Sequence, residues 1–154
     1  MLVEHLLGTT TALARLGLGE PLDPADPWGG GQGSADADWD GRLVRNLEAI
    51  GRGWSRLEAW SGDARVGSSS MPRPMLGETV LVEVATHGWD VARALGRTVE
   101  LRDEAADAVL QAASSTAELG RRMGADGPEV PVPVDASALD RALGQVGRDP
   151  DWSA

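Results

Sequence analysis

One long stretch in the middle of the chain, residues 75–96, constrains the fold more than any other feature of the sequence. Its first part, TVLVEV, is rich in β-branched residues and could by itself form a strand. Over the whole stretch, however, apolar residues recur at helical spacings for longer than a usual strand lasts. The members of this apolar stripe are Leu76, Val80, Leu81, Val84, Gly88, Val91, Ala92 and Leu95. The pattern therefore predicts a helix over 75–96 and argues against a central strand at 79–84.

Similar patterns in the rest of the chain predict three more long helices and a short one. The long helices are expected near 2–17, 38–60 and 102–123, and the short one follows Asp135. Between them, SGDARVGSSSMPRP is expected to be a connector, and DGPEVPVPVD an extended linker because proline disfavours helix. We therefore predict an all-α fold, most simply an antiparallel helical bundle with a short C-terminal helix, in a single domain over 1–154.

The composition excludes several kinds of chemistry. The chain carries 24 acidic against 14 basic residues, a net charge of −10, which argues against nucleic acid or an anionic membrane surface as a partner. Lysine is absent, so no Schiff base can form, and the absence of cysteine rules out disulfides, zinc–thiolate sites and a thiol nucleophile. An active site would have to use His, Asp, Glu, Ser, Thr and Arg, together with whatever these residues bind.

The sequence also leads to an expectation about location. No apolar run approaches the roughly 20 residues that a membrane-spanning helix needs. The N-terminal segment has no basic region, and Glu4 and His5 interrupt it early, which is unlike a secretory signal. A cytoplasmic protein is the default expectation.

The stretch EVATHGWD, within the predicted helix 75–96, carries the most distinctive polar residues. Glu83 and His87 are four positions apart and so share one helix face, with His87 inside the apolar stripe and Glu83 and Asp90 at its edge. A buried carboxylate without a partner costs several kcal/mol, and a divalent metal would neutralise it while using the imidazole lone pair. The alternative is an ordinary hydrogen-bonded Glu–His pair near the surface.

Asp90 has two interpretations of its own. It can lie at the solvent edge and pair with Arg93, or it can accept a hydrogen bond from the imidazole N–H of a metal-binding histidine.

His5 is the only other histidine in the chain, and it too is predicted to lie on a helix beside an apolar face. His5, Glu83 and His87 together would form a His2Glu set with open coordination positions, as found in catalytic zinc sites. Spacing alone does not show that the two helices are neighbours. At this point both a metal site and a structural pair remain open.

Three segments resemble one family. LVEHLLG and ETVLVEVATHGWDVARALGR resemble signature segments of the DinB-like, mycothiol-dependent maleylpyruvate isomerase superfamily. The tail VPVPVDASALDRALGQVGRDPDW is similar to the C-terminal end of its small, single-domain metal-binding members. The resemblance implies a four-helix bundle with one divalent metal, zinc or nickel, held by residues at the positions of His5, Glu83 and His87.

The resemblance also implies a chemistry. Members of this family use the low-molecular-weight thiol mycothiol as cofactor, and relatives transfer such thiols to small electrophilic substrates. This would suit a chain without cysteine, because the sulfur would be brought in. The isomerases proper carry a further C-terminal domain, so isomerisation of maleylpyruvate itself is not expected. The alternative function is a non-catalytic metal-binding or stress-associated bundle, in which the metal serves stability.

The start of the chain departs from the family pattern. Members carry one more helix before the histidine-bearing one, and here that helix is expected to be missing. Leu2, Val3, Leu6 and Leu7 spread over more of the helix surface than one neighbour can bury. This predicts that the surface is either exposed, at a cost in stability, or covered by another chain in a homodimer.

Overall fold

The fold is described here from a computed structural model, for residues 2–29 and 36–153. It consists mainly of α-helices, as the sequence predicts, and falls into two compact units, Met1–Gly77 and Glu78–Ala154, each described by itself. The prediction of a single domain stays a prediction. None of the described helices is long and apolar enough to cross a membrane.

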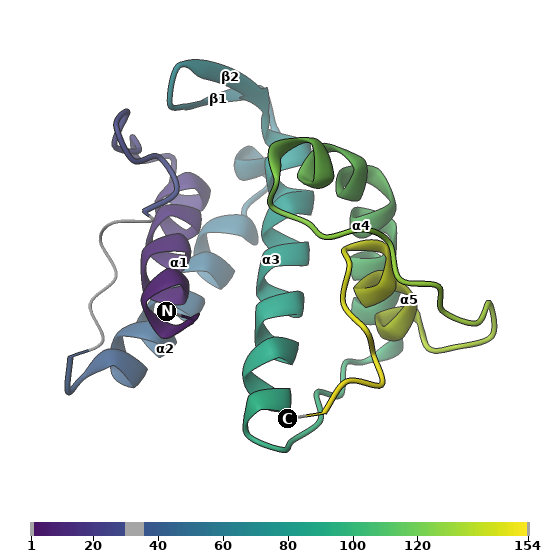
Figure 1. The fold of residues 1–154 in the computed structure, drawn as a ribbon. Helices are drawn as coiled ribbons and strands as arrows, with labels where there is room; N and C mark the ends of the chain where they lie inside the picture. The colour runs from purple at the N-terminus through teal and green to yellow at the C-terminus, as the bar shows by residue number, and fades with distance from the viewer. Residues whose placement is uncertain (1, 30–35, 154) are drawn as a thin grey trace. The chain divides into compact units, whose positions relative to one another are not determined.

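The first unit is built on two packed helices, α1 (Leu2–Leu18) and α2 (Trp39–Trp54) (Figure 1). The prediction that α2 runs to residue 60 is wrong, because Arg56 has an extended backbone that ends the helical path. A 3-10 turn, Leu57–Trp60, follows, and Leu57 is 84% exposed although it continues the apolar spacing of α2.

Trp60 gives this change of direction a physical role. Its indole Nε1 donates a hydrogen bond of 2.7 Å to the backbone carbonyl of Trp54, one of the carbonyls that the end of α2 leaves without a helical partner. The two indoles also pack edge to face, with ring centroids 5.5 Å apart. The α-helix therefore ends at Trp54, and the contact of Trp60 with that end takes the place of the further helical turns that the spacing predicted.

The connector predicted after this turn contains a small antiparallel ribbon. Strand β1 (Asp63–Val66) pairs with β2 (Ser69–Pro72), and the two-residue loop between them begins at Gly67, whose φ is +60°. A positive φ at that position matches the tight hairpin turns that glycine favours. The segment does connect two helices, as predicted, but its strands are too short and too polar for the periodicity of the sequence to reveal the hairpin.

Glycine allows α1 and α2 to approach closely. Gly17 and Gly53 are both buried, and a Cβ added to Gly53 would lie only 2.7 Å from the backbone carbonyl carbon of Gly17. Trp54 Nε1 donates to the carbonyl of Leu13, and Arg56 Nη2 to that of Gly17, each over 3.0 Å. The C-terminal half of α2 is thus fixed on α1 by backbone contact and by side-chain donors.

Replacing Gly53 by alanine is therefore expected to destabilise the protein, by about 1–3 kcal/mol as for other overpacked interiors. Gly51 provides the matched control, since it lies in the same helix, is exposed, and has nothing within 4 Å of an added Cβ. Gly51→Ala should instead stabilise, by up to about 1 kcal/mol, because alanine favours helix over glycine. Urea unfolding of both variants measures the difference, and equal effects would contradict the close contact.

The apolar surface near the start of α1 is largely buried within the chain. Leu6 and Leu7 are only 6% and 1% exposed, and Leu2 and Val3 are half-buried. The prediction that this surface must be exposed or covered by a second chain is therefore wrong for Leu6 and Leu7.

The second unit contains most of α3 (Arg73–Ala94), with α4 (Asp103–Met123) and α5 (Ala138–Gln145). These helices confirm the predicted ones to within about two residues, and the TVLVEV run is helical. The boundaries follow local chemistry. Gly124 ends α4 with a left-handed φ of +74°, and the Ser137 side chain caps α5 by accepting from the Asp140 backbone N–H over 3.1 Å.

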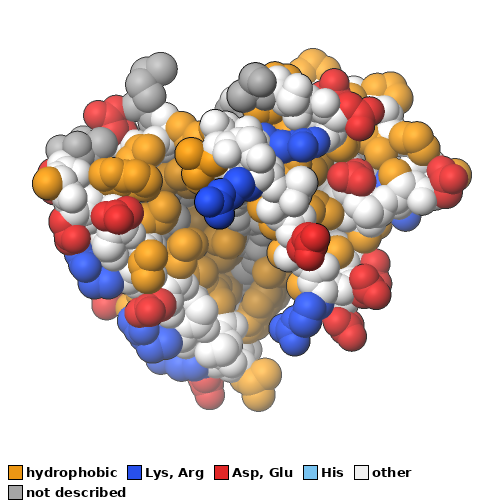
Figure 2. All heavy atoms as spheres, turned by 90° about the horizontal axis from the view of Figure 1, so that it is seen from below, with side chains coloured by type: hydrophobic (Ala, Val, Ile, Leu, Met, Phe, Trp, Pro, Cys, Tyr) orange, Lys and Arg blue, Asp and Glu red, His pale blue; other side chains and the backbone are white. Residues whose placement is uncertain are grey.

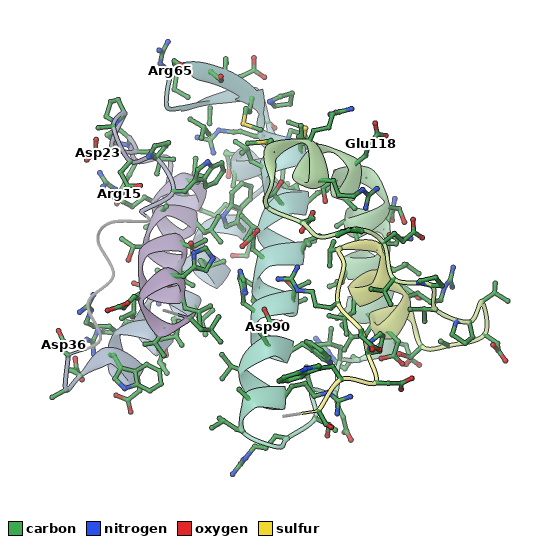
Figure 3. The ribbon with its side chains drawn as sticks, in the orientation of Figure 1. Arg15, Asp23, Asp36, Arg65, Asp90 and Glu118 are labelled. Carbon is green, nitrogen blue, oxygen red and sulfur yellow. The ribbon has the colours of Figure 1, made fainter. Side chains whose placement is uncertain are left out.

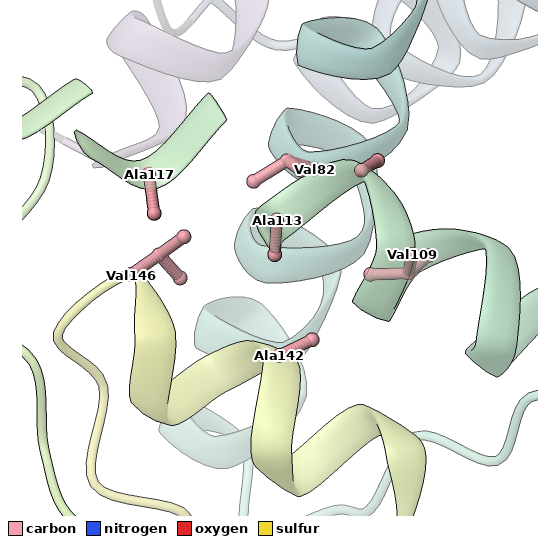
Figure 4. Close-up of a cluster of buried hydrophobic side chains, with 7 residues drawn as sticks. Val82, Val109, Ala113, Ala117, Ala142 and Val146 are labelled. Carbon is pink, nitrogen blue, oxygen red and sulfur yellow. The ribbon is translucent and has the colours of Figure 1, made fainter. Parts of the chain in front are cut away.

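Small side chains make the core of this unit compact (Figure 4). The face of α4 that the sequence marks with alanine packs against α3 and against the end of α5, and Ala113 and Val146 are fully buried. The buried members of this cluster are Val82, Val109, Ala112, Ala113, Ala117, Ala142 and Val146. A second cluster joins Trp89 of α3 to Leu139 and Leu143 of α5. Together the clusters hold the middle of α3 rigidly against α4 and α5.

Burial along the other apolar stripes is incomplete. In α2, Ile50 and Trp54 are buried, but Trp39 and Leu47 are 36% and 39% exposed. Hydrophobic side chains are also interspersed with acidic and basic ones over the face that Figure 2 displays. The recurring apolar spacing therefore predicts where α2 begins but overstates both its length and its burial.

Candidate metal centre

Three polar side chains of α3 meet on one face of the second unit, as the sequence predicts. His87 Nε2 lies 3.2 Å from Glu83 Oε2, and His87 Nδ1 lies 2.9 Å from Asp90 Oδ2. The side chains are sheltered, with His87 14% exposed, Glu83 27% and Asp90 23%. Asp90 lies in the C-terminal half of α3 (Figure 3). The imidazole therefore has one carboxylate at each ring nitrogen.

Burial and the two carboxylates act in opposite directions on His87. Burial by itself lowers the pKa of the imidazole, but hydrogen bonds and charge from Asp90 and Glu83 outweigh it and raise the pKa to about 9. Burial likewise tends to raise the pKa of Asp90, but its contacts with His87 and an arginine bring the net pKa below the usual value. Without a metal, His87 is thus a cation between two acids at neutral pH.

That arginine, Arg148, belongs to the candidate site but was not predicted from the sequence. Its Nη2 lies 3.3 Å from Asp90 Oδ2 and its Nη1 lies 3.7 Å from Asp126 Oδ1. Asp126 is itself sheltered, and burial raises the pKa of its carboxyl although Arg148 opposes that shift. Arg148 is remote from Asp90 in the sequence and follows α5, so no helical spacing connects them.

Arg93, the partner considered for Asp90 at the solvent edge, is used elsewhere. Its Nη2 donates to the carbonyl of Pro150, and its guanidinium lies 5.5 Å from the centre of the Trp89 ring. Asp90 pairs with His87 and Arg148 instead. Of the two interpretations of Asp90, the structure thus favours the acceptor of an imidazole N–H.

His5 lies in α1, in the first unit, where its side chain is exposed. Its Nδ1 is 3.5 Å from the hydroxyl oxygen of Thr9, one helical turn further on. Its convergence with Glu83 and His87 stays a prediction.

The arrangement on α3 meets the chemical requirements of one half of a metal site. A metal-binding histidine uses the lone pair of one nitrogen and donates the other N–H to a carboxylate or carbonyl. Here Asp90 occupies Nδ1, so Nε2 would be the ligand atom, and it lies beside a carboxylate oxygen of Glu83. An ion between Nε2 and Glu83 would replace the proton that otherwise separates them.

Comparison of the chain with protein-family models, with curated proteins and with solved structures finds no match in any of the three. The resemblance to the DinB-like superfamily therefore stays a prediction.

Proposed function

We propose that this chain is a divalent-metal-binding helical protein, with Glu83 and His87 as ligands and Asp90 as the acceptor that orients His87. The observation that carries the proposal is that the two ring nitrogens of His87 have different partners, Nδ1 being bonded to Asp90 and Nε2 lying beside Glu83. Two carboxylates around one sheltered imidazole make a site of net negative charge once the imidazole is neutral. A divalent cation compensates that charge better than a single proton does.

His5 is the proposed third ligand. With Glu83 and His87 it would make a set of two imidazoles and one carboxylate that could hold a metal ion. Two imidazoles and one carboxylate favour zinc, with nickel also accommodated by such ligands. Three protein ligands leave coordination positions for water or a small molecule, which distinguishes this set from a closed structural site.

We further propose a DinB-like bundle and a reaction of the thiol-dependent type, on the basis of the resemblance of the segments around His5 and His87. When bound, the metal would lower the pKa of a coordinated thiol and hold it as the thiolate. The protein would bind the ion through His5, Glu83 and His87, while Asp90 keeps the His87 ring in one tautomer. Because the chain has no cysteine, the thiol would be mycothiol or a similar small molecule. The thiol would either be transferred to a small electrophile or promote the isomerisation of one.

Metal content tests the proposal directly. We expect purified protein, loaded with zinc and desalted, to retain about one ion per chain by elemental analysis. Glu83→Gln removes the charge but keeps the shape of the side chain. It should weaken zinc binding by at least roughly 10–100-fold, which is the loss typical when a residue that only hydrogen-bonds to a metal ligand is replaced. Glu118→Gln on α4 is the control, since Glu118 forms an exposed ion pair with Arg122 and belongs to no candidate site. Equal zinc affinity of both variants would refute Glu83 as a ligand.

A thiol-transfer assay then separates the two functions considered for the site. With a small thiol and a model electrophile such as a chloro-dinitroarene, a metal-dependent enzyme should lose its activity on chelation and regain it with zinc. A chain that binds zinc tightly but gives the same rate with and without it would be a metal-binding bundle without this catalytic activity.

A further inference from the structure

Arg148 is placed by a close contact between two loop glycines. Gly147 has a left-handed φ of +82°, and a Cβ added to it would lie 2.7 Å from Cα of Gly127. Only glycine fits at such a position without strain. The contact brings together the residues that neighbour the two glycines, Asp126 and Arg148, so the guanidinium extends between Asp126 and Asp90.

Asp90 needs this support for geometric reasons. It is the acceptor for His87 Nδ1, yet a carboxylate on a helix surface can rotate away from its partner toward solvent. Arg148 Nη2 reaches the same oxygen, Oδ2, that faces His87. Its other nitrogen, Nη1, is held by the carbonyl of Val146 at 3.1 Å and by Asp126, so the guanidinium is itself fixed.

We propose that Arg148 is a positioning residue for the metal site, which acts through Asp90 to hold the His87 ring with Nδ1 bonded and Nε2 directed at the ion. This inference rests on the proposed function. It extends the site beyond α3 in a chain of supports: the ligand His87, then Asp90, then Arg148, and finally the glycine contact that aims Arg148.

Arg121 provides a matched comparison within the same unit. Its Nη1 donates to the carbonyl of Gln145 over 2.7 Å, so it fixes the end of α5 just before Arg148. It is half-buried like Arg148 but, among the contacts of the described residues, none joins it to Asp90 or His87. The charge of Arg121 also acts on Asp126. Arg121→Gln therefore removes an arginine from this part of the fold, while the contacts of Asp90 with Arg148 and with His87 stay in place.

The test compares Arg148→Gln, Arg148→Lys and Arg121→Gln by two measurements at fixed pH. The first is NMR of the ring nitrogens, which is simple because the chain has only two histidines and His5→Ala assigns them. The Nδ1–H proton of His87 should be sharp and slow to exchange in the metal-free wild type and in Arg121→Gln, and broadened or lost in Arg148→Gln. Arg148→Lys should recover much of it, because an ammonium can still donate to Asp90, although it lacks the planar fork with which the guanidinium also reaches Val146 and Asp126.

The second measurement is zinc affinity, by competition with a chromophoric chelator. Arg148→Gln should weaken zinc binding by about tenfold, the smaller of the effects usual for residues that support a metal ligand without touching the metal. Arg148→Lys should regain most of that affinity. Arg121→Gln should lower stability and leave zinc affinity within about twofold of wild type. Unchanged affinity and an unchanged Nδ1–H signal in Arg148→Gln would overturn the inference. Absence of zinc binding in the wild type would refute the proposed function instead, and the NMR signal would still decide whether Arg148 positions His87.

Discussion

Replacing His87 by alanine is expected to reduce zinc affinity by a factor of about 100 or more, more than the loss of any group outside the ligand shell. The imidazole supplies the proposed ligand atom, which lies 3.2 Å from Glu83 Oε2, and its removal also takes from Asp90 the closer of its partners, leaving the hydrogen bond from Arg148. Chelator competition measures the affinity. Retention of wild-type zinc binding by His87→Ala would remove the α3 site from consideration.

The same series tests whether His5 belongs to the site. If His5 and His87 hold one ion, each single alanine variant should lose most of the affinity, and the double variant should lose little more, because both act on one bound metal. If His5 is not a ligand, His5→Ala should bind zinc like the wild type. Thr9→Val is the control for local effects on α1, since Thr9 is the neighbour whose hydroxyl lies 3.5 Å from His5 Nδ1.

Stability of the metal-free protein should fall as pH rises from about 6.5 to 9. The pKa of His87 is raised from 6.5 to about 9 in the folded protein, because the bonds to Asp90 and Glu83 outweigh the effect of burial. A group whose pKa is higher in the folded state stabilises fully below its unfolded pKa and not at all above its folded one. At about 1.4 kcal/mol for each pH unit between the unfolded and the folded pKa, the loss of unfolding free energy across this window is roughly 3–4 kcal/mol.

Urea unfolding with a chelator present, at several pH values, measures this dependence. His87→Gln provides the baseline, because its side chain does not titrate, and the difference between the two proteins should shrink with rising pH. Zinc should reverse the sign, since the ion must displace the proton from His87 and its stabilising effect grows as the pH rises. A difference between wild type and His87→Gln that stays constant from pH 6.5 to 9 would contradict the ionised pair.

Helical periodicity is sufficient to predict the helices of the second unit, because residues close in the sequence determine where these helices run and end. The stripe through Leu76 and Val80 outlasts a strand, and Gly124 and Ser137 mark helix ends that local chemistry fixes. The pairing of Glu83 with His87 was predictable for the same reason, since one helical turn separates them.

Other features depend on contacts that are distant in the sequence. The end of α2 is set by Trp60 returning to the Trp54 carbonyl, and Leu57 fits the apolar spacing yet is exposed. Arg148 reaches Asp90 only because Gly147 and Gly127 meet. Pattern reasoning within one helix therefore located Asp90 but favoured no partner for it, and Arg148 was missed altogether.

X-ray absorption at the zinc edge of the zinc-loaded protein tests the central claim most directly. Because the chain has no cysteine, it has no thiolate of its own to bind zinc, and a thiolate signal would appear only when a thiol is added. We predict nitrogen and oxygen ligands at roughly 2.0–2.2 Å, with the outer-shell scattering of two imidazoles, reduced to one imidazole in His5→Ala. A zinc shell without imidazole scattering, or one unchanged in His87→Ala, would contradict a metal centre built on His87.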